Sequence, residues 1–195
     1  MMDAIFLDRD GVLNEEIGYA SDPKDLRLIT GAPAAIRVFN ERSIPVVVVS
    51  NQSGIARGYH TETDTKRFNA ALSKALQKEG AYVDGWYYCP HHPDGKGEYA
   101  KVCDCRKPMP GLLRRAADEM SLDLSRSVVI GDKASDIAAG IAVGCQTVLV
   151  LTGHGANEWA VWREDFQPSH VAPDLARATE WLLAKWRRIC RPIGS

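Results

Sequence analysis

Two carboxylates, Asp8 and Asp10, follow the short apolar run 4–7 and precede Gly11. Side chains two residues apart on an extended chain point the same way, so the two acids can share one site. Two neighbouring negative charges repel each other unless a cation or a shared proton lies between them. The pattern therefore predicts either a divalent metal site or an acid and a base with different pKa values. An aspartate-rich turn at Gly11 is the alternative without chemistry.

Polar side chains also follow two later apolar runs, and two cations end a long loop. Parallel strands place their carboxyl ends at the same edge of a sheet, so the residues that follow them come together. Hydroxyl groups and lysines bind phosphoryl oxygens, and carboxylates bind divalent cations. The set therefore indicates phosphate chemistry. Its members are Ser50, Asn51 and Gln52 after the run 45–49, Asp132 and Asp136 after the run 127–130, and Arg106 and Lys107 at the end of the loop.

Strand-like and helix-like patterns alternate along the chain. They predict an α/β fold, a Rossmann-like parallel sheet with helices on both faces and a ligand site outside the carboxyl ends of the strands. The connection 12–31 is too short for a separate cap domain. The predicted strands are 4–7, 45–49, 83–88, 127–130 and 146–151, with an extended piece at 169–172. The predicted helices are 33–42, 61–80, 110–120, 134–143 and 175–189.

Length and charge limit the functions that the chain can have. Its 195 residues are 45% hydrophobic, enough to bury one core, and we expect a single domain over 1–195. The net charge of -1 provides no field that would attract nucleic acid or anionic lipid. No stretch approaches the ~18 apolar residues of a membrane span. We expect a cytoplasmic monomer whose partner is a small phosphorylated molecule, not nucleic acid or a membrane.

Three of the five cysteines lie close together in the segment 89–107, called the Cys/His loop below. The residues that follow Cys89 have no periodicity, and such a long loop needs support. In a reducing compartment clustered cysteines indicate metal ligands before disulfides. Three thiolates and one imidazole form a closed tetrahedral set that is typical of structural zinc. His91 and His92 compete for the fourth position, whereas we expect His60, His154 and His170 to be surface or turn residues.

These residues resemble the four motifs of the haloacid dehalogenase (HAD) superfamily of aspartate-nucleophile phosphatases, in the same order and over nearly the whole chain. Val12 stands where the superfamily often has threonine, but that hydroxyl is not the nucleophile. The resemblance implies hydrolysis of a phosphate monoester. The matching residues are Asp8-x-Asp10-Gly11, Ser50, Lys107 and Gly131-Asp132-x-x-x-Asp136.

The chemistry of this reaction gives each residue a candidate role. Asp8 is the nucleophile, which forms an aspartyl-phosphate and divides one difficult step into two. Asp10 is the general acid for the leaving alkoxide and then the base that activates water. Ser50 and Lys107 would hold the equatorial oxygens of the transferring group. The resemblance also implies catalytic Mg²⁺, with the ligands Asp8, the backbone carbonyl of Asp10 and the carboxylate of Asp132, and with Asp136 orienting the set.

A second resemblance is more specific. The segments Cys89-Pro90-His91-His92-Pro93 and Cys103-Asp104-Cys105-Arg106-Lys107-Pro108 are similar to the zinc-bearing HAD subgroup that contains the heptose bisphosphate and histidinol-phosphate phosphatases. The resemblance implies structural Zn²⁺ on Cys89, His91, Cys103 and Cys105. The heptose family is the more similar one, through Leu7-Asp8-Arg9-Asp10-Gly11, Asn14, Gly18-Tyr19 and Ser50-Asn51-Gln52-Ser53-Gly54. It implies removal of the 7-phosphate of D-glycero-D-manno-heptose 1,7-bisphosphate, in the synthesis of heptose nucleotides and lipopolysaccharide precursors.

Without a cap, short loops around the site must select the substrate. Arg106 and Lys133 can bind the phosphate that is not cleaved, which favours a bisphosphate over a monophosphate. Histidinol phosphate carries an amine at that position and gains little from Arg106. The expected substrate contacts are Arg9, Glu16, Gly18, Tyr19, Asn51, Gln52, Ser53, Arg106 and Lys133.

Three alternatives differ in their requirements. A histidinol-phosphate or other small sugar-phosphate phosphatase would share the motifs but not the preference for a bisphosphate. A receiver-like domain also has acids, a hydroxyl and a lysine at strand ends, but it accepts phosphate from a partner and does not turn over small esters. A zinc-stabilised binding module leaves Asp8, Asp10, Asp132 and Lys107 unexplained. A phosphatase assay separates the enzymes from the other two.

Overall fold

The computed structural model describes residues 2–189, and the side chains of 2–186. Its six strands form one sheet in the order β3-β2-β1-β4-β5-β6, and all neighbouring strands are parallel. This arrangement confirms the predicted α/β fold. The strands are β1 Ile5–Leu7, β2 Val46–Asn51, β3 Gly85–Cys89, β4 Val128–Gly131, β5 Gln146–Val150 and β6 His170–Ala172.

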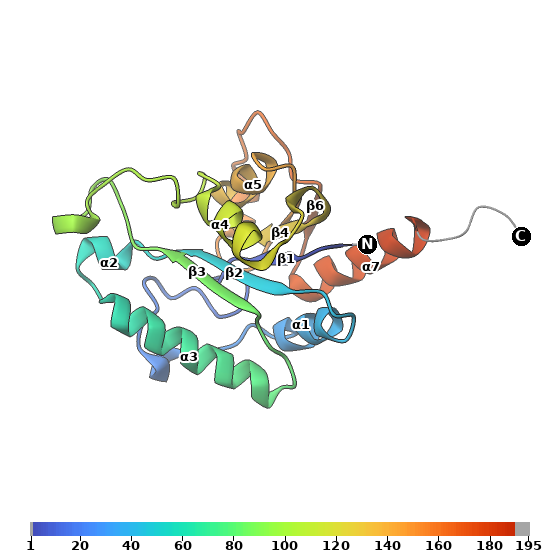
Figure 1. The fold of residues 1–195 in the computed structure, drawn as a ribbon, viewed down its shortest axis with the longest axis horizontal. Helices are drawn as coiled ribbons and strands as arrows, with labels where there is room; N and C mark the ends of the chain where they lie inside the picture. Colours follow the sequence, from blue (N-terminus) through green and yellow to red (C-terminus); the bar gives the residue numbers. More distant parts are fainter. Residues whose placement is uncertain (1, 190–195) are drawn as a thin grey trace, which may run out of the picture.

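Helices cover both faces of the sheet. In Figure 1, α1 and α3 lie on one side of the strands and α4 and α5 on the other. No helix among the described residues is long and apolar enough to cross a membrane. The helices are α1 Ala32–Asn40, α2 Gly54–Arg57, α3 Glu62–Lys78, α4 Gly111–Met120, α5 Ala134–Ile141, α6 Gly155–Ala160 and α7 Leu175–Ile189, with short 3-10 helices at Pro23–Asp25, Gly97–Tyr99 and Leu124–Arg126.

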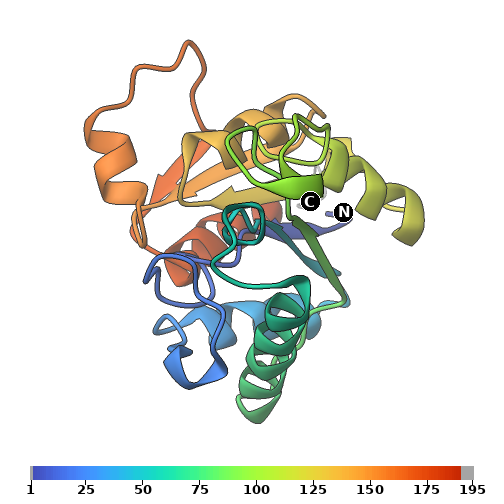
Figure 2. The same ribbon diagram turned by 90° about the vertical axis from the view of Figure 1, so that its left-hand side faces the viewer.

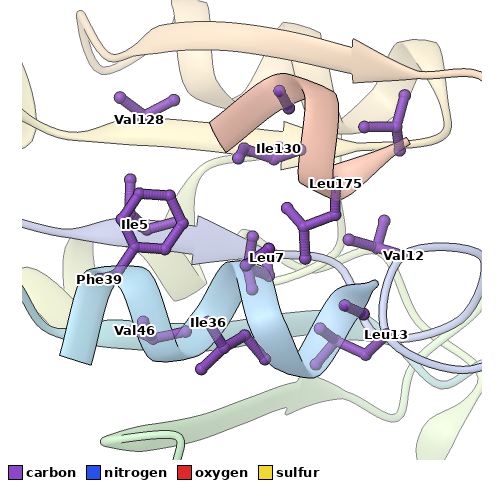
Figure 3. Packing of buried hydrophobic residues seen from close by; sticks show 14 of the residues in the cluster. Ile5, Leu7, Val12, Leu13, Ile36, Phe39, Val46, Val128, Ile130 and Leu175 are labelled. Atoms are coloured by element: carbon purple, nitrogen blue, oxygen red, sulfur yellow. The ribbon is translucent and has the colours of Figure 1, made fainter. Parts of the chain in front are cut away.

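Alternating strand residues build two hydrophobic cores, because successive side chains point to opposite faces of a sheet. Ile5 and Leu7 of β1 pack with Ile36 and Phe39 of α1 and with Leu175 of α7 (Figure 3). The intervening residues face the other way. Ala4 and Phe6 pack with α4 through Leu112, Leu113 and Ala116. Strands buried on both faces explain why the runs 4–7 and 45–49 are continuously apolar.

The strand order reverses direction at β1, which lies between β2 and β4. In open α/β sheets ligands bind outside the carboxyl ends of the strands at such a switch point. Figure 2 faces this edge of the sheet, with the β1–α1 connection, α2, the Cys/His loop and α6 around the strand ends. Among the described residues the β1–α1 connection contains only one short 3-10 helix, Pro23–Asp25, so it holds no large cap domain.

The structure adds two short helices that periodicity does not predict, α2 and α6. Each has fewer than two full turns, too few for an apolar stripe to be recognised. Both lie on the short connections that follow β2 and β5, at the edge of the sheet where the site residues gather. β3 begins at Gly85, two residues later than expected, since the Asp84 carboxylate accepts a hydrogen bond from the N–H of Val46 at 2.8 Å.

Candidate active site

Three buried carboxylates, Asp8, Asp132 and Asp136, form a cluster at the carboxyl ends of β1 and β4. One oxygen of each lies within 4.8 Å of the others. Lys107 faces this carboxylate cluster. Its Nζ lies 3.0 Å from Oδ1 of Asp8 and 2.5 Å from Oδ1 of Asp136. Lys107 is only 5% exposed, so these ion pairs are hardly screened by water.

The carboxylate cluster carries more negative than positive charge. Burial, together with the charges of Asp8 and Asp136, raises the pKa of Asp132 to about 8. Burial also raises the pKa of Asp136, although Lys107 opposes the shift. Burial by itself would lower the pKa of Lys107, but Asp136 and Asp8 raise it above its ordinary value. Lys107, even with Lys133 nearby, thus leaves the three carboxylates short of positive charge.

The cluster has the donor set of a hard divalent cation, because all its ligand atoms are oxygens. Oδ1 of Asp132 is buried and has no hydrogen-bond partner among the described residues, while Oδ2 accepts from the N–H of His154 at 2.8 Å. The backbone crowds this carboxylate closely. A Cβ on Gly11 or on Gly153 would lie 2.3 Å from Oδ2, and both glycines have positive φ, +82° and +57°. The residues therefore fit Mg²⁺.

The carboxylate of Asp10 is held by three side chains. Arg9 donates to it through Nη2 at 2.8 Å and Nε at 3.1 Å, Asn14 through Nδ2 at 2.8 Å and Gln52 through Nε2 at 2.9 Å. Burial alone would raise the pKa of Asp10, but Arg9 and the hydrogen bonds lower it below its ordinary value. Asp10 is therefore ionised and fixed in one orientation.

Arg9 differs from its expected role as a substrate contact. It is 0% exposed and does not line the cavity. Besides Asp10, its guanidinium donates to the carbonyl of Ala20 and to Gln52, and it packs over the ring of Phe68 at 4.6 Å. These contacts use the guanidinium fully, so the structure corrects this expectation: Arg9 positions Asp10 from below the site.

The end of β2 supports both Asp10 and Lys107. The amide of Asn51 donates to the carbonyl of Lys107 at 2.9 Å and accepts from its N–H at 3.0 Å. Gln52 donates to the hydroxyl of Ser50 at 2.8 Å as well as to Asp10. Lys107 Nζ also donates to the carbonyl of Val49 at 2.7 Å. The lysine is thus fixed through both its backbone and its side chain.

A cavity of about 320 Å³ opens above these groups. It brings together most residues that the sequence predicts: Asp8, Asp10, Glu16, Gly18, Tyr19, Asn51, Gln52, Ser53, Lys107, Lys133 and Asp136. Among the residues predicted for catalysis, substrate or Mg²⁺, those that do not line it are Arg9, Ser50, Arg106 and Asp132, of which Ser50 and Asp132 are buried directly beside lining residues. Gly54, Ser135 and His154 line it without having been predicted as site residues.

His154 is an exposed turn residue, as we expect from the sequence, but it also lines the cavity. Its Nε2 lies 3.4 Å from Oε2 of Glu16, and Nζ of Lys133 lies 3.5 Å from the same oxygen. The three side chains form a polar group at one end of the cavity. The position of His154 just after the fifth strand was the available signal, because the other strand ends also supply site residues.

His60 also departs from expectation. It is 9% exposed, and both of its ring nitrogens are buried without a hydrogen-bond partner among the described residues. Its ring packs against Gly54, where an added Cβ would lie 2.2 Å from Cε1. Burial, with Arg9 nearby, lowers its pKa. His60 is therefore a neutral packing residue behind the cavity.

The Cys/His loop gathers its sulfur atoms at one point. Sγ of Cys105 lies 3.1 Å from Sγ of Cys89 and of Cys103, and 3.4 Å from Nδ1 of His91. His92 is elsewhere: its Nε2 lies 3.1 Å from Arg57. Burial raises the pKa of the Cys89 thiol. Three thiols and one imidazole, close enough to share one ion, fit tetrahedral zinc.

Contacts around this loop connect it to the rest of the site. The carboxylate of Glu62 accepts hydrogen bonds from the hydroxyls of Tyr88 at 2.6 Å and Tyr99 at 3.0 Å, so α3 anchors the loop. Arg106 points back into the loop and donates to the carbonyl of His91 at 3.3 Å. It does not line the cavity, whereas its neighbour Lys107 does.

Comparisons with known proteins agree with this arrangement. The HAD-hydrolase-like family model matches residues 104–178. The chain is 44% identical over 154 residues to D-glycero-beta-D-manno-heptose-1,7-bisphosphate 7-phosphatase from Haemophilus influenzae, covering 78% of this chain and 84% of that protein. It is 38% identical over 182 residues to the Escherichia coli K12 protein of the same name, covering 92% of this chain and 87% of that protein.

A solved structure is also similar to this fold. It is D,D-heptose 1,7-bisphosphate phosphatase from B. bronchiseptica, complexed with magnesium and phosphate, and it superimposes with a TM-score of 0.85 at 34% identity, covering 94% of this chain and 99% of that one.

The fold and the strand-end acids define a hydrolase of the HAD-like class. This class is the one that the four sequence motifs resemble, so the predicted resemblance is confirmed. At these identities and coverages, the chain belongs to the D-glycero-D-manno-heptose-1,7-bisphosphate 7-phosphatase family of phosphoric monoester hydrolases. An enzyme is thereby favoured over the receiver-like domain and the zinc-stabilised binding module.

Proposed function

We propose that this chain hydrolyses the 7-phosphate of D-glycero-D-manno-heptose 1,7-bisphosphate through an aspartyl-phosphate. One observation carries the proposal: Asp8 and Asp10 line the same cavity, with Lys107 paired to Asp8 at 3.0 Å. A nucleophile, a proton-transfer group and a fixed cation are the three parts that transfer of a phosphoryl group requires. The similarity to the curated heptose phosphatases supports the choice of substrate.

In the first step an oxygen of Asp8 attacks phosphorus, and the bond between phosphorus and the sugar oxygen breaks. Asp10 donates a proton to the departing oxygen, which leaves as an alcohol. The low pKa of Asp10 in the free protein favours its ionised form, so the phosphate must help it to acquire that proton. A nearby dianion does this, because like charge raises a carboxyl pKa.

In the second step Asp10, now ionised, removes a proton from water. The resulting hydroxide attacks phosphorus, the bond to Asp8 breaks, and inorganic phosphate leaves. The hydrogen bonds from Arg9, Asn14 and Gln52 keep the same Asp10 carboxylate in place for both proton transfers. Lys107, with the hydroxyl of Ser50, would hold the phosphoryl oxygens in both steps.

Asp8, the carbonyl of Asp10 and Asp132 would hold Mg²⁺. Mg²⁺ bound there supplies the positive charge that lets an anionic nucleophile approach an anionic phosphate. Asp136 would orient these groups through Lys107, whose Nζ lies 2.5 Å from Oδ1 of Asp136. Cys89, His91, Cys103 and Cys105 would hold structural zinc, which orders the loop that ends at Lys107.

We assign the phosphate that is not cleaved to Lys133, because Lys133 lines the cavity and Arg106 does not. His154 lies at the same end of the cavity and offers a second donor. This assignment modifies the expectation that Arg106 carries the preference for a bisphosphate. Arg106 would reach the cavity only by leaving the carbonyl of His91.

We further propose that residues 1–195 act as one domain, as a cytoplasmic monomer, and that the product enters heptose-nucleotide synthesis for lipopolysaccharide. The alternative substrates are histidinol phosphate and small sugar phosphates other than the heptose. The deciding experiment is kcat/KM for both anomers of the heptose bisphosphate, fructose 1,6-bisphosphate and histidinol phosphate, with wild type, Lys133→Ala and Arg106→Ala. We expect the heptose to lead by at least ~100-fold and Lys133→Ala to remove much of that lead. Histidinol phosphate in first place would overturn the proposal.

A further inference from the structure

Two exposed tyrosines, Tyr19 and Tyr59, stand together at the mouth of the cavity. Tyr19 lines the cavity and is 46% exposed, and Tyr59 is 63% exposed. Their ring centroids lie 4.5 Å apart with the planes tilted by 52°. Large aromatic side chains are usually mostly buried. Because both rings are exposed and Tyr19 lines the cavity, the pair leaves a free aromatic surface beside the reacting groups.

The backbone is fixed at the two points from which the rings project. Tyr19 has a φ of 47° and follows Gly18 with a φ of 69°, and Tyr59 follows Gly58 with a φ of 79°. Left-handed backbone at a bulky residue costs about 1–3 kcal/mol and persists only where the surroundings impose it. Here the N–H of Gly18 donates to Oε1 of Glu16 at 2.7 Å, and the N–H of Tyr59 donates to the carbonyl of Gly54 at 2.9 Å.

Gly54 fits tightly against this pair. A Cβ on Gly54 would lie 3.0 Å from Cδ1 of Tyr19, so any side chain at Gly54 would crowd the ring. At the other end of the same short loop, Glu16 faces Lys133 and His154. The loop 16–19 therefore lines the cavity with a cationic end, where Lys133 faces Glu16, and an aromatic end at Tyr19.

We infer that Tyr19, packed against Tyr59, presents an aromatic wall that binds the C–H face of a sugar ring. Tyr19 touches the ring, and Tyr59 is a positioning residue that holds Tyr19 in its orientation. The face of an aromatic ring is electron-rich, and the C–H groups of a sugar are polarised by their oxygens, so the two surfaces attract each other. The cationic end recognises phosphate and the aromatic wall recognises the ring, which distinguishes sugar phosphates from phosphates without a ring.

The inference rests on the proposed function to the extent that the substrate is a ring-containing sugar phosphate. The test compares wild type, Tyr59→Ser and Tyr59→Phe on the heptose bisphosphate and on acetyl phosphate, which has no ring. Tyr59→Ser should raise KM for the heptose about tenfold, with kcat and the hydrolysis of acetyl phosphate changed less than twofold. Tyr59→Phe keeps the ring and should retain the wild-type KM. Tyr82→Ser is the matched control, since Tyr82 is 46% exposed but precedes β3 at the opposite end of the sheet.

An equal loss of kcat/KM on both substrates in Tyr59→Ser would overturn the inference, because it indicates a disturbed loop and not lost ring recognition. An unchanged KM for the heptose would overturn it as well. If wild type hydrolyses fructose 1,6-bisphosphate better than the heptose, the proposed function fails. The aromatic wall is then judged by the same variants on fructose 1,6-bisphosphate against acetyl phosphate.

Discussion

Asn51 forms two hydrogen bonds with the backbone of Lys107, donating to its carbonyl at 2.9 Å and accepting from its N–H at 3.0 Å. This pair joins the end of β2 to the end of the Cys/His loop. It fixes the backbone from which Lys107 reaches Asp8 and Asp136. Positioning of the lysine therefore depends on both the sheet and the loop.

Asn51→Ala should lower kcat/KM by about 30-fold, because two hydrogen bonds of about 1 kcal/mol each no longer hold Lys107. Steady-state kinetics on the preferred sugar phosphate measure the effect. Asn40→Ala is the matched control, since Asn40 makes the same two bonds to the backbone of Tyr82, at 3.1 and 2.9 Å, far from the cavity. Equal activity in the two variants would contradict this role.

Cys103→Ser should remove most of the bound zinc, of which we expect about one ion per chain. Cleavage of the Cys/His loop by protease should become faster, and activity should fall without being abolished because Asn51 still holds Lys107. Elemental analysis and limited proteolysis measure both effects. Cys145→Ser, which changes a cysteine outside the cluster, should keep the zinc. Removal of zinc by chelator with no change in loop cleavage or kinetics would exclude the structural role.

Asp8→Asn should abolish turnover while leaving the fold and most substrate affinity intact, because an amide of the same size is no nucleophile. Turnover, substrate binding and thermal unfolding are measured together. Asp118→Asn, on the exposed face of α4, controls for the loss of one negative charge. More than a tenth of wild-type turnover remaining in Asp8→Asn would assign the nucleophile to another group.

Arg9→Lys should move the acidic limb of the pH profile of kcat, which includes the second step, to higher pH. Arg9 lowers the pKa of Asp10, and a lysine cannot form the bidentate contact that Nε and Nη2 of Arg9 make with the Asp10 carboxylate. The pKa of Asp10 should therefore rise, and the ionised form needed as a base should be lost at a higher pH. Arg27→Lys, at an exposed arginine, is the control. If the acidic limb stays at the same pH in Arg9→Lys, the limb does not reflect the pKa of Asp10.

Without magnesium, the free energy of unfolding should fall as pH rises from about 4 toward 8. The pKa of Asp132 is about 8 in the folded chain and near its ordinary 3.8 when unfolded, so the folded state binds the extra proton in this window. Denaturant unfolding in chelator at several pH values measures the slope. Asp132→Asn should flatten the slope, and a wild-type slope retained in this variant would assign the pH dependence to other groups.

The sequence alone determined where along the chain the candidate site residues follow the strands. Apolar runs 4–7, 45–49 and 127–130 each end in polar residues, and a parallel sheet necessarily brings such ends to one edge. That local pattern was sufficient for the α/β fold and for placing Asp8, Asp10 and Asp132 at one edge of the sheet, whereas the family was indicated by the resemblance of the motifs. The local pattern depends only on the strand period and on the direction of the strands.

The tertiary structure decided what depends on contacts between distant segments. Arg9 precedes Asp10 in the chain and would suit a substrate contact, yet Ala20, Gln52 and Phe68 enclose its guanidinium below the cavity. His91 and His92 are neighbours in sequence, and only the path of the loop turns His91 toward the sulfur atoms. The Tyr19–Tyr59 pair joins residues 40 positions apart through two left-handed turns. Side-chain burial and pairing of this kind depend on the packing of whole loops, which no local period encodes.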